Sequence, residues 1–178
     1  MGGGKPLRLL GGKRLIDHAE ALASQWSRIV AVAARSAAQV GHTRFPQITD
    51  DDSIEGPLAG LAASLRLARE EACDAVMTIA ADMPFLPPEL AGRLSREIGS
   101  HHAAIASSGS YLHPVCGLWR VATLEQLPDY LHSGRRSLKG FAEAVGFARV
   151  EWPLGSPDPF MNINSAEDLA KAEAILTA

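Results

Sequence analysis

The fold of this chain is decided by the stretch Asp74-Ala-Val-Met-Thr-Ile-Ala-Ala81, followed directly by Asp82-Met-Pro-Phe-Leu-Pro-Pro88. The first part is almost continuously apolar, which is typical of a central strand buried on both faces of a sheet. The strand must end soon after it, because proline has no backbone N–H to donate, and Pro87 and Pro88 favour the start of a helix. Asp82 is therefore predicted to lie at the carboxyl end of a buried strand.

Strand-like and helix-like segments alternate on both sides of this stretch. Apolar residues recur at helical spacing, and short β-branched or apolar runs separate them. The alternation predicts an α/β fold of one domain over residues 1–178, with a mostly parallel sheet covered by helices on both faces. The predicted helices are 14–26, 58–68, 90–98, 121–131, 137–145 and one starting at Ser165, and the predicted strands are 28–33, 74–81, 103–106, 114–120 and 148–152.

Composition narrows the class of protein. The net charge is −3, with Lys and Arg scattered along the chain, which does not favour binding of nucleic acid. No apolar run has the length of a membrane span, and the start does not resemble a secretory signal. The two cysteines, Cys73 and Cys116, lie far apart and belong to no metal-binding motif. A cytoplasmic location with reduced thiols is the prediction.

Asp82 is the strongest candidate for chemistry. Ligands of open α/β folds bind at the carboxyl ends of the strands. A carboxylate there suits Mg²⁺, which prefers oxygen ligands and holds the phosphates of a nucleotide. An aspartate that caps the turn before Pro84 would look the same in sequence, so position alone leaves these two interpretations equal.

Two further segments carry polar groups in suggestive places. Asp50-Asp51-Asp52-Ser-Ile-Glu-Gly56-Pro57-Leu58-Ala59-Gly60 leads an acidic loop into a helix start. Asp50 there could bind a base or a sugar edge, although a solvated acidic loop is the default interpretation. Asn162 and Asn164 alternate on an extended segment, where they could bind metal, phosphate or hydroxyl groups. Turn and capping chemistry explains Asn164 well and Asn162 less well.

Two basic segments are weaker candidates. Gly2-Gly3-Gly4-Lys5 could bind a phosphate through backbone N–H groups and an ammonium, although a frayed terminus explains the glycines better. Arg135 and Arg136 could bind a second, anionic substrate through paired N–H groups. An exposed arginine pair is more often only a solvated surface.

Several motifs together resemble one family. They are Gly-Gly-Lys-Pro-Leu near the start, Gly56-Pro-Leu-Ala-Gly60, Ala81-Asp-Met-Pro-Phe85 and Asn162-Ile-Asn-Ser-Ala-Glu-Asp-Leu169, in this order. Through these motifs the chain resembles molybdenum cofactor guanylyltransferases over almost its whole length. The segment His113-Pro-Val-Cys-Gly-Leu-Trp119 fits the same family. Each motif is modest alone, but four in order are specific.

The resemblance implies a Rossmann-like nucleotidyltransferase fold, Mg²⁺ as cofactor, and GTP and molybdopterin as substrates. It places Lys5 at the nucleotide phosphates, Asp50 in the guanine-nucleotide pocket, and Asp82 at the metal. Gly56, Pro57, Leu58, Ala59 and Gly60 would shape the nucleotide pocket. Asn162, Asn164, Arg135 and Arg136 would face molybdopterin. Partners could include molybdoenzyme chaperones or other cofactor-biosynthesis proteins.

Two departures from the family pattern matter. The family's first strand and its Leu-Ala-Gly-Gly turn have no counterpart in these residues, so we expect the sheet to lack that strand. A start site placed too late or a truncated chain would explain this. Gly4 also stands where the family usually has an aspartate before the lysine. Both departures leave two alternatives open, a related cytidylyl- or adenylyltransferase and an inactive nucleotide-binding module.

Overall fold

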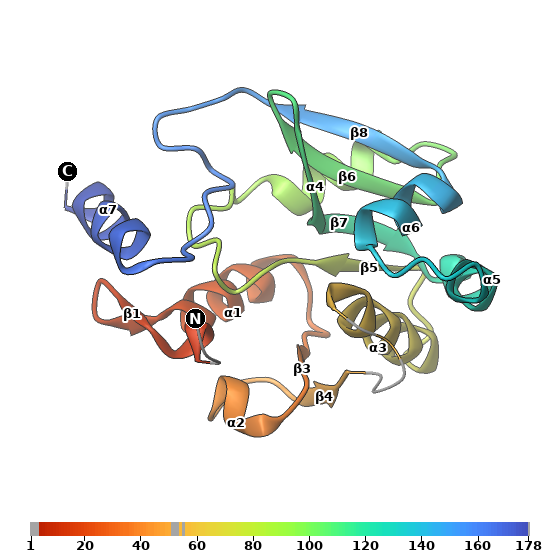
Figure 1. Cartoon of the computed structure of the whole chain (residues 1–178), viewed down its shortest axis with the longest axis horizontal. Helices are drawn as coiled ribbons and strands as arrows, with labels where there is room; N and C mark the ends of the chain where they lie inside the picture. The colour runs from red at the N-terminus through yellow and green to blue at the C-terminus, as the bar shows by residue number, and fades with distance from the viewer. Residues whose placement is uncertain (1–3, 51–53, 55, 178) are drawn as a thin grey trace.

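The computed structural model describes residues 4–50, 54 and 56–177 (Figure 1). The helices are α1 (Leu15–Trp26), α2 (Ala37–Val40), α3 (Pro57–Glu70), α4 (Leu90–Glu97), α5 (Leu127–His132), α6 (Leu138–Val145) and α7 (Ala166–Leu176), with 3-10 helices η1 (Lys5–Leu7) and η2 (Val121–Gln126). The strands are β1 (Leu9–Leu10), β2 (Lys13–Arg14), β3 (Val32–Ala34), β4 (Gln47–Thr49), β5 (Ala75–Thr78), β6 (Ala103–Ser108), β7 (Tyr111–Arg120) and β8 (Phe147–Trp152).

The largest sheet has the strand order β5–β7–β6–β8. β7 is antiparallel to both β5 and β6, and β8 is parallel to β6. β5, β6 and β8 therefore run in the same direction with β7 reversed between them, which agrees with the predicted mostly parallel sheet. A separate parallel pair, β3 and β4, lies beside this sheet.

Helices cover both faces of the main sheet, as the alternation predicted. On one face, Ile105 and Trp119 pack in a core with residues of α3, α5 and α6. On the other face, Ala104 and Ala106 pack in a second core with α4. Figure 1 shows α4 and α6 on opposite sides of β6. The neighbouring residues of β6 thus point into different cores, as the period of a strand requires.

β5 differs from the prediction for its sequence. Its four residues are all half-buried, whereas the continuous apolar run predicted burial on both faces. The physical reason is its position, since β5 pairs with β7 along one edge and no other described strand pairs with it. The expectation of complete burial was therefore wrong for this strand.

The two ends of the described chain meet. Gly11 and Gly12, at φ +58° and +75°, form the tight turn between β1 and β2, a conformation that favours glycine. α7 packs against this hairpin, because the side chains of Leu10 and Leu15 form a core with Ile163 and Ala172. Gly11 N–H also donates to the Glu173 carboxylate at 2.9 Å.

The predicted start of the last helix is confirmed. The Ser165 hydroxyl accepts a hydrogen bond from Asp168 N–H, and the Asp168 side chain accepts one from Ser165 N–H, which is a capping box. Within the described residues, no helix is long and apolar enough to cross a membrane.

Candidate functional site

Three of the predicted site residues come together at the carboxyl end of β5. Lys5 Nζ lies 3.8 Å from Asp82 Oδ2. The same ammonium donates a hydrogen bond of 2.6 Å to Asn164 Oδ1. These residues come from three distant parts of the sequence, so the lysine joins a strand-end carboxylate to an amide beside the last helix.

Backbone contacts fix this arrangement. Ile163 N–H donates to the Asp82 carbonyl at 2.9 Å, which ties the segment before α7 to the loop after β5. Asn164 N–H donates to the Asp168 carboxylate at 3.0 Å, so the capping box of α7 also holds Asn164. Lys5 begins η1 after Gly4, whose φ of +119° is a conformation that L side chains rarely adopt. Backbone hydrogen bonds at Asp82 and Asn164, and the backbone conformation before Lys5, thus position the three side chains of the site.

The electrostatics of Asp82 favour a cation beside it. The side chain of Asp82 is only 23% exposed, and burial raises the pKa of its carboxyl group, while the nearby Lys5 ammonium acts to lower it. The separation of 3.8 Å between Lys5 and Asp82 is too long for a direct hydrogen bond. Asp82 therefore keeps carboxylate oxygens that a second cation can bind.

A cavity of about 950 Å³ is lined by two of these three residues, and Asn164 is not among its lining residues. Lys5 and Asp82 line it, together with Asp50, Pro57 and Gly60 from β4 and α3. Gly60 lies beside Asp50, because a Cβ atom at Gly60 would make an ordinary van der Waals contact with Asp50 Oδ1, at 3.4 Å. The structure thus brings the predicted nucleotide-pocket aspartate and the predicted metal aspartate to one cavity.

The rest of the Gly56 to Gly60 motif has a different place. Gly56 precedes α3 with φ +71°, and Pro57 occupies the first turn of this helix. Leu58 and Ala59 are fully buried in the hydrophobic core and do not line the cavity. The acidic residues Asp51 and Asp52 and the glycines Gly2 and Gly3 lie outside the described residues.

The donor set of the site fits Mg²⁺ as a partner of a bound nucleotide. Among residues 4–50, 54 and 56–177, no group of three or more His, Cys, Asp or Glu side chains could hold a metal by itself. Mg²⁺ usually binds one or two carboxylates and takes its remaining ligands from water and substrate phosphates. Asp82, a half-buried carboxylate at the open cavity, is a ligand of this kind.

Comparisons with known proteins agree with this geometry. Residues 1–146 match the model of the MobA-like NTP transferase domain. The chain belongs to this family. The molybdenum cofactor guanylyltransferase of Cereibacter sphaeroides is 38% identical over 168 residues, which cover 94% of this chain and 85% of the relative. This chain is therefore a MobA-like nucleotidyltransferase.

Solved structures show the same fold. Molybdopterin-guanine dinucleotide biosynthesis protein A from Archaeoglobus fulgidus has a TM-score of 0.77 and 25% identity, covering 99% of this chain and 95% of that one. The 2-C-methyl-D-erythritol 4-phosphate cytidylyltransferase from Thermus thermophilus has a TM-score of 0.68 and 18% identity, covering 98% of this chain and 94% of that one. The second likeness shows the fold alone. Together they confirm the predicted Rossmann-like nucleotidyltransferase fold.

The remaining predicted residues of this MobA-like chain do not line the cavity. Arg135 and Arg136 lie exposed between α5 and α6. The Arg135 guanidinium lies over the Tyr130 ring at 5.0 Å from its centroid, and Arg136 Nη1 donates to the Leu131 carbonyl at 2.7 Å. Asn162 is exposed two residues before Asn164. Contact of any of these with a second substrate stays a prediction.

The structure also adds groups that the sequence did not reveal. His113 lies within β7, where its Nε2 atom is 2.8 Å from Ser108 Oγ. Its ring stacks on Phe160 at a centroid distance of 4.5 Å, in the segment that leads to Asn164. The sequence marked His113 only as the first residue of the motif His113 to Trp119, which does not indicate these contacts.

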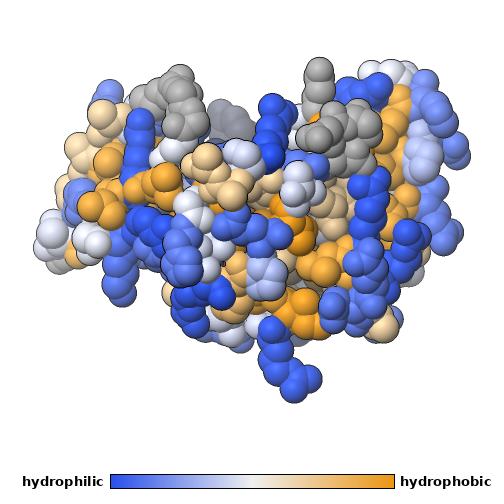
Figure 2. All heavy atoms as spheres, turned by 90° about the horizontal axis from the view of Figure 1, so that it is seen from below, coloured by the Kyte–Doolittle hydropathy of each residue, from blue (hydrophilic) through white to orange (hydrophobic). Residues whose placement is uncertain are grey.

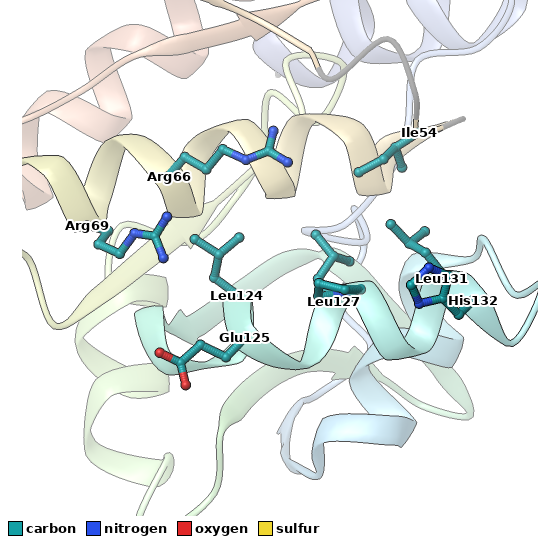
Figure 3. A pocket seen from close by; sticks show the side chains of 9 residues that line it. Ile54, Arg66, Arg69, Leu124, Glu125, Leu127, Leu131 and His132 are labelled. Atoms are coloured by element: carbon teal, nitrogen blue, oxygen red, sulfur yellow. The ribbon is translucent and has the colours of Figure 1, made fainter.

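A second pocket, of about 470 Å³, lies between α3 and the η2–α5 segment (Figure 3). Leu124, Leu127 and Leu131 form its apolar side, and Arg66 and Arg69 line it from α3. This pocket shares no lining residue with the cavity that holds Lys5 and Asp82. None of the predicted site residues lines this second pocket, whereas Lys5, Asp50, Pro57, Gly60 and Asp82 line the larger cavity.

Proposed function

We propose that this MobA-like nucleotidyltransferase transfers a guanylyl group from GTP to the terminal phosphate of molybdopterin, with Mg²⁺ and with release of pyrophosphate. The observation that carries the proposal is the contact of Lys5 with both Asp82 and Asn164 at the carboxyl end of β5. The name of the Cereibacter sphaeroides relative supports the choice of substrates.

The reaction needs positioning and charge stabilisation more than covalent chemistry by the protein. A terminal phosphate oxygen of molybdopterin forms a bond to the α-phosphorus of GTP, and the bond from this phosphorus to the bridging oxygen of pyrophosphate breaks. Bound Mg²⁺ would neutralise charge on the phosphates of GTP. Asp82 would hold this ion through a carboxylate that is already partly removed from water.

Lys5 would stabilise the negative charge that develops on the leaving pyrophosphate. Its ammonium has three donors, and Asn164 accepts from one of them. Asn164 would thereby orient Lys5, while the remaining donors face the phosphates. Asp50, beside Gly60, would bind the nucleoside part of GTP in the same cavity.

The test uses two aspartates at opposite ends of β5. Asp82→Asn removes the proposed metal ligand, and Asp74→Asn is the matched control, because Asp74 is exposed just before this strand. We expect Asp82→Asn to lower GTP turnover with molybdopterin by about 100- to 1,000-fold, the range for loss of one strong charge-stabilising group. It should also abolish the Mg²⁺-dependent rise in melting temperature that GTP produces.

Asp74→Asn should keep both properties. Full turnover by Asp82→Asn would refute the role of Asp82. Turnover of GTP, CTP and ATP should also be compared, because equal use of the three nucleotides would contradict guanylyl transfer and favour the broader nucleotidyltransferase alternatives. An absence of turnover with any nucleotide would support the inactive-module alternative instead.

A further inference from the structure

The strand β7 has a bulge near its start, within the motif that begins at His113. Gly117 pairs with Ile105 of β6, whereas His113 pairs with the next residue of β6, Ala106. The three residues between them, 114–116, therefore have no partner on β6. Because β7 runs antiparallel to β5, this part of β7 lies at the sheet edge where β5 ends. Bulges are frequent beside active sites, where they change the direction of a side chain.

The side chain that follows from this bulge is the ring of His113, which contacts Phe160. The two rings stack at a centroid distance of 4.5 Å and an angle of 8° between their planes. On the same His113 ring, Nε2 lies 2.8 Å from the buried Ser108 hydroxyl. Trp152 of β8 meets the Phe160 ring edge-on at 5.5 Å. The buried Phe160 is thus held between a ring of β7 and a ring of β8.

The segment that follows Phe160 carries groups of the candidate site. It forms neither helix nor strand until α7 begins, so no ladder of backbone hydrogen bonds fixes it. Ile163 N–H donates to the Asp82 carbonyl at 2.9 Å. One residue later, Asn164 Oδ1 accepts from Lys5 Nζ at 2.6 Å. The position of Phe160 therefore helps to decide where Ile163 and Asn164 meet their partners.

We propose that His113 is a positioning residue of the reaction, whose ring holds Phe160 and thereby the segment that brings Asn164 to Lys5. The proposal rests on the proposed guanylyl transfer, in which Lys5 stabilises the leaving pyrophosphate. His113 does not line the cavity of Lys5 and Asp82, so it acts through this segment and not by contact with substrate. Histidine suits this place, because its ring stacks on Phe160 while a ring nitrogen bonds a hydroxyl.

Hydrogen exchange of the Ile163 amide, without any substrate, tests the positioning. His113→Ala removes the ring and should speed this exchange at least about tenfold, because the bond to Asp82 opens more often. His113→Phe keeps a stacking ring and should return the rate to within about threefold of the unmodified chain. Val145→Ala is the matched control, since Val145 is buried in the core on the other face of the sheet, and it should not change the rate.

Two outcomes of this measurement would overturn the proposal. One is unchanged Ile163 exchange in His113→Ala, and the other is equal acceleration by His113→Ala and Val145→Ala. Neither depends on whether the chain transfers guanylyl groups. If the unmodified chain uses no nucleotide, the proposed function fails, and exchange at Ile163 still decides the role of His113.

Turnover of GTP with molybdopterin tests the link to Asn164. His113→Ala should lower kcat by about 10- to 100-fold, the cost of a small displacement of an orienting group. The double variant with Asn164→Ala should be no slower than Asn164→Ala alone, because two residues that act through one contact are not additive. Losses that multiply would show that His113 acts elsewhere and would overturn the proposal.

A second histidine serves as the matched control for turnover. His42 is exposed in the segment between α2 and β4. Figure 2 shows the face that carries these elements, where apolar side chains reach the surface among charged ones. His42→Ala should leave kcat unchanged, because this segment lies outside the ring contacts around Phe160. A loss as large as that of His113→Ala would remove the distinction between the two histidines and overturn the proposal.

Two serine variants decide the matter if His113→Ala does not fold. Ser108→Ala removes only the hydroxyl beside Nε2 of His113, and it should speed exchange at Ile163 about threefold, as expected for the loss of one hydrogen bond. Ser107→Ala is its control, because the neighbouring Ser107 hydroxyl bonds the Val150 carbonyl and the Arg149 guanidinium instead. Equal exchange at Ile163 in both serine variants would overturn the proposal.

Discussion

β6 and β5 belong to the same sheet, yet the strand with the less hydrophobic sequence is the more buried of the two. β6 reads Ala-Ala-Ile-Ala-Ser-Ser and all six of its residues are buried, whereas β5 reads Ala-Val-Met-Thr and all four are half-buried. β6 pairs with a strand on each edge, while β5 pairs on one. The burial of a strand thus depends on its neighbours more than on its own hydrophobicity.

The largest expected effect is a loss of stability in the core that packs against β6 and β7. Phe141 is fully buried and stacks on Trp119 of β7 at a centroid distance of 5.9 Å. Phe141→Ala should lower the free energy of unfolding by about 3–5 kcal/mol, because it leaves a cavity in a filled core. Met77→Ala on β5 should cost less than about 2 kcal/mol, since Met77 is already half-exposed. Urea unfolding of both variants measures the difference, and equal costs would remove the contrast between the two strands.

A smaller effect is expected at the start of α7. Ser165→Ala removes the hydroxyl that caps α7 and should cost about 1 kcal/mol of stability. Ser100→Ala, at an exposed turn, is the control and should change the free energy of unfolding by less than about 0.5 kcal/mol. An equal and negligible cost of both changes would show that the capping box contributes nothing.

The smallest effect concerns pH and the ring of His113 in β7, which stacks on Phe160. Burial lowers the pKa of His113, which the charge of Asp158 partly opposes. The unfolded chain then binds a proton more readily than the folded chain. The contribution of His113 is present above the pKa of an unfolded histidine, about 6.5, and is lost as the pH falls through the lower folded pKa.

Melting temperatures at pH 7 and pH 5 test whether acidification destabilises the protein through His113. The unmodified chain should lose more stability on acidification than His113→Gln does. His132→Gln is the matched control, because His132 is exposed at the end of α5. If the melting temperature of His113→Gln falls as much between pH 7 and pH 5 as that of the unmodified chain, the His113 ring is not the source of the pH dependence.

Local elements were predicted well where their signals are local. The helix expected at residues 14–26 is Leu15–Trp26, and the start at Ser165 is a capping box. The segment 121–131 was expected as one helix, but a 3-10 helix over Val121–Gln126 precedes the helix Leu127–His132. Pro128 explains the division, since it occupies the first turn of the new helix, where its missing N–H costs nothing.

Non-local features could not be predicted from periodicity. The burial of β5 depends on which strands lie at its two edges, and its own residues do not specify them. Lys5 and Asn164 were singled out for separate reasons, and only the fold shows that they form a hydrogen bond across 159 positions. The exposed arginines 135 and 136 show the converse, because a basic pair in sequence says nothing about its distance from the cavity.

The contact between Lys5 and Asn164 also has a consequence for how the protein is made. A ribosome releases the chain from its N-terminal end, so Lys5 and Asp82 are free to fold long before Asn164 appears. The hydrogen bond of 2.6 Å to Lys5 and the packing of Ala172 on Leu10 require the chain to have emerged through Ala172. The ammonium that we place at the nucleotide phosphates is therefore oriented only after Asn164 has been made, long after Asp82 and Asp50.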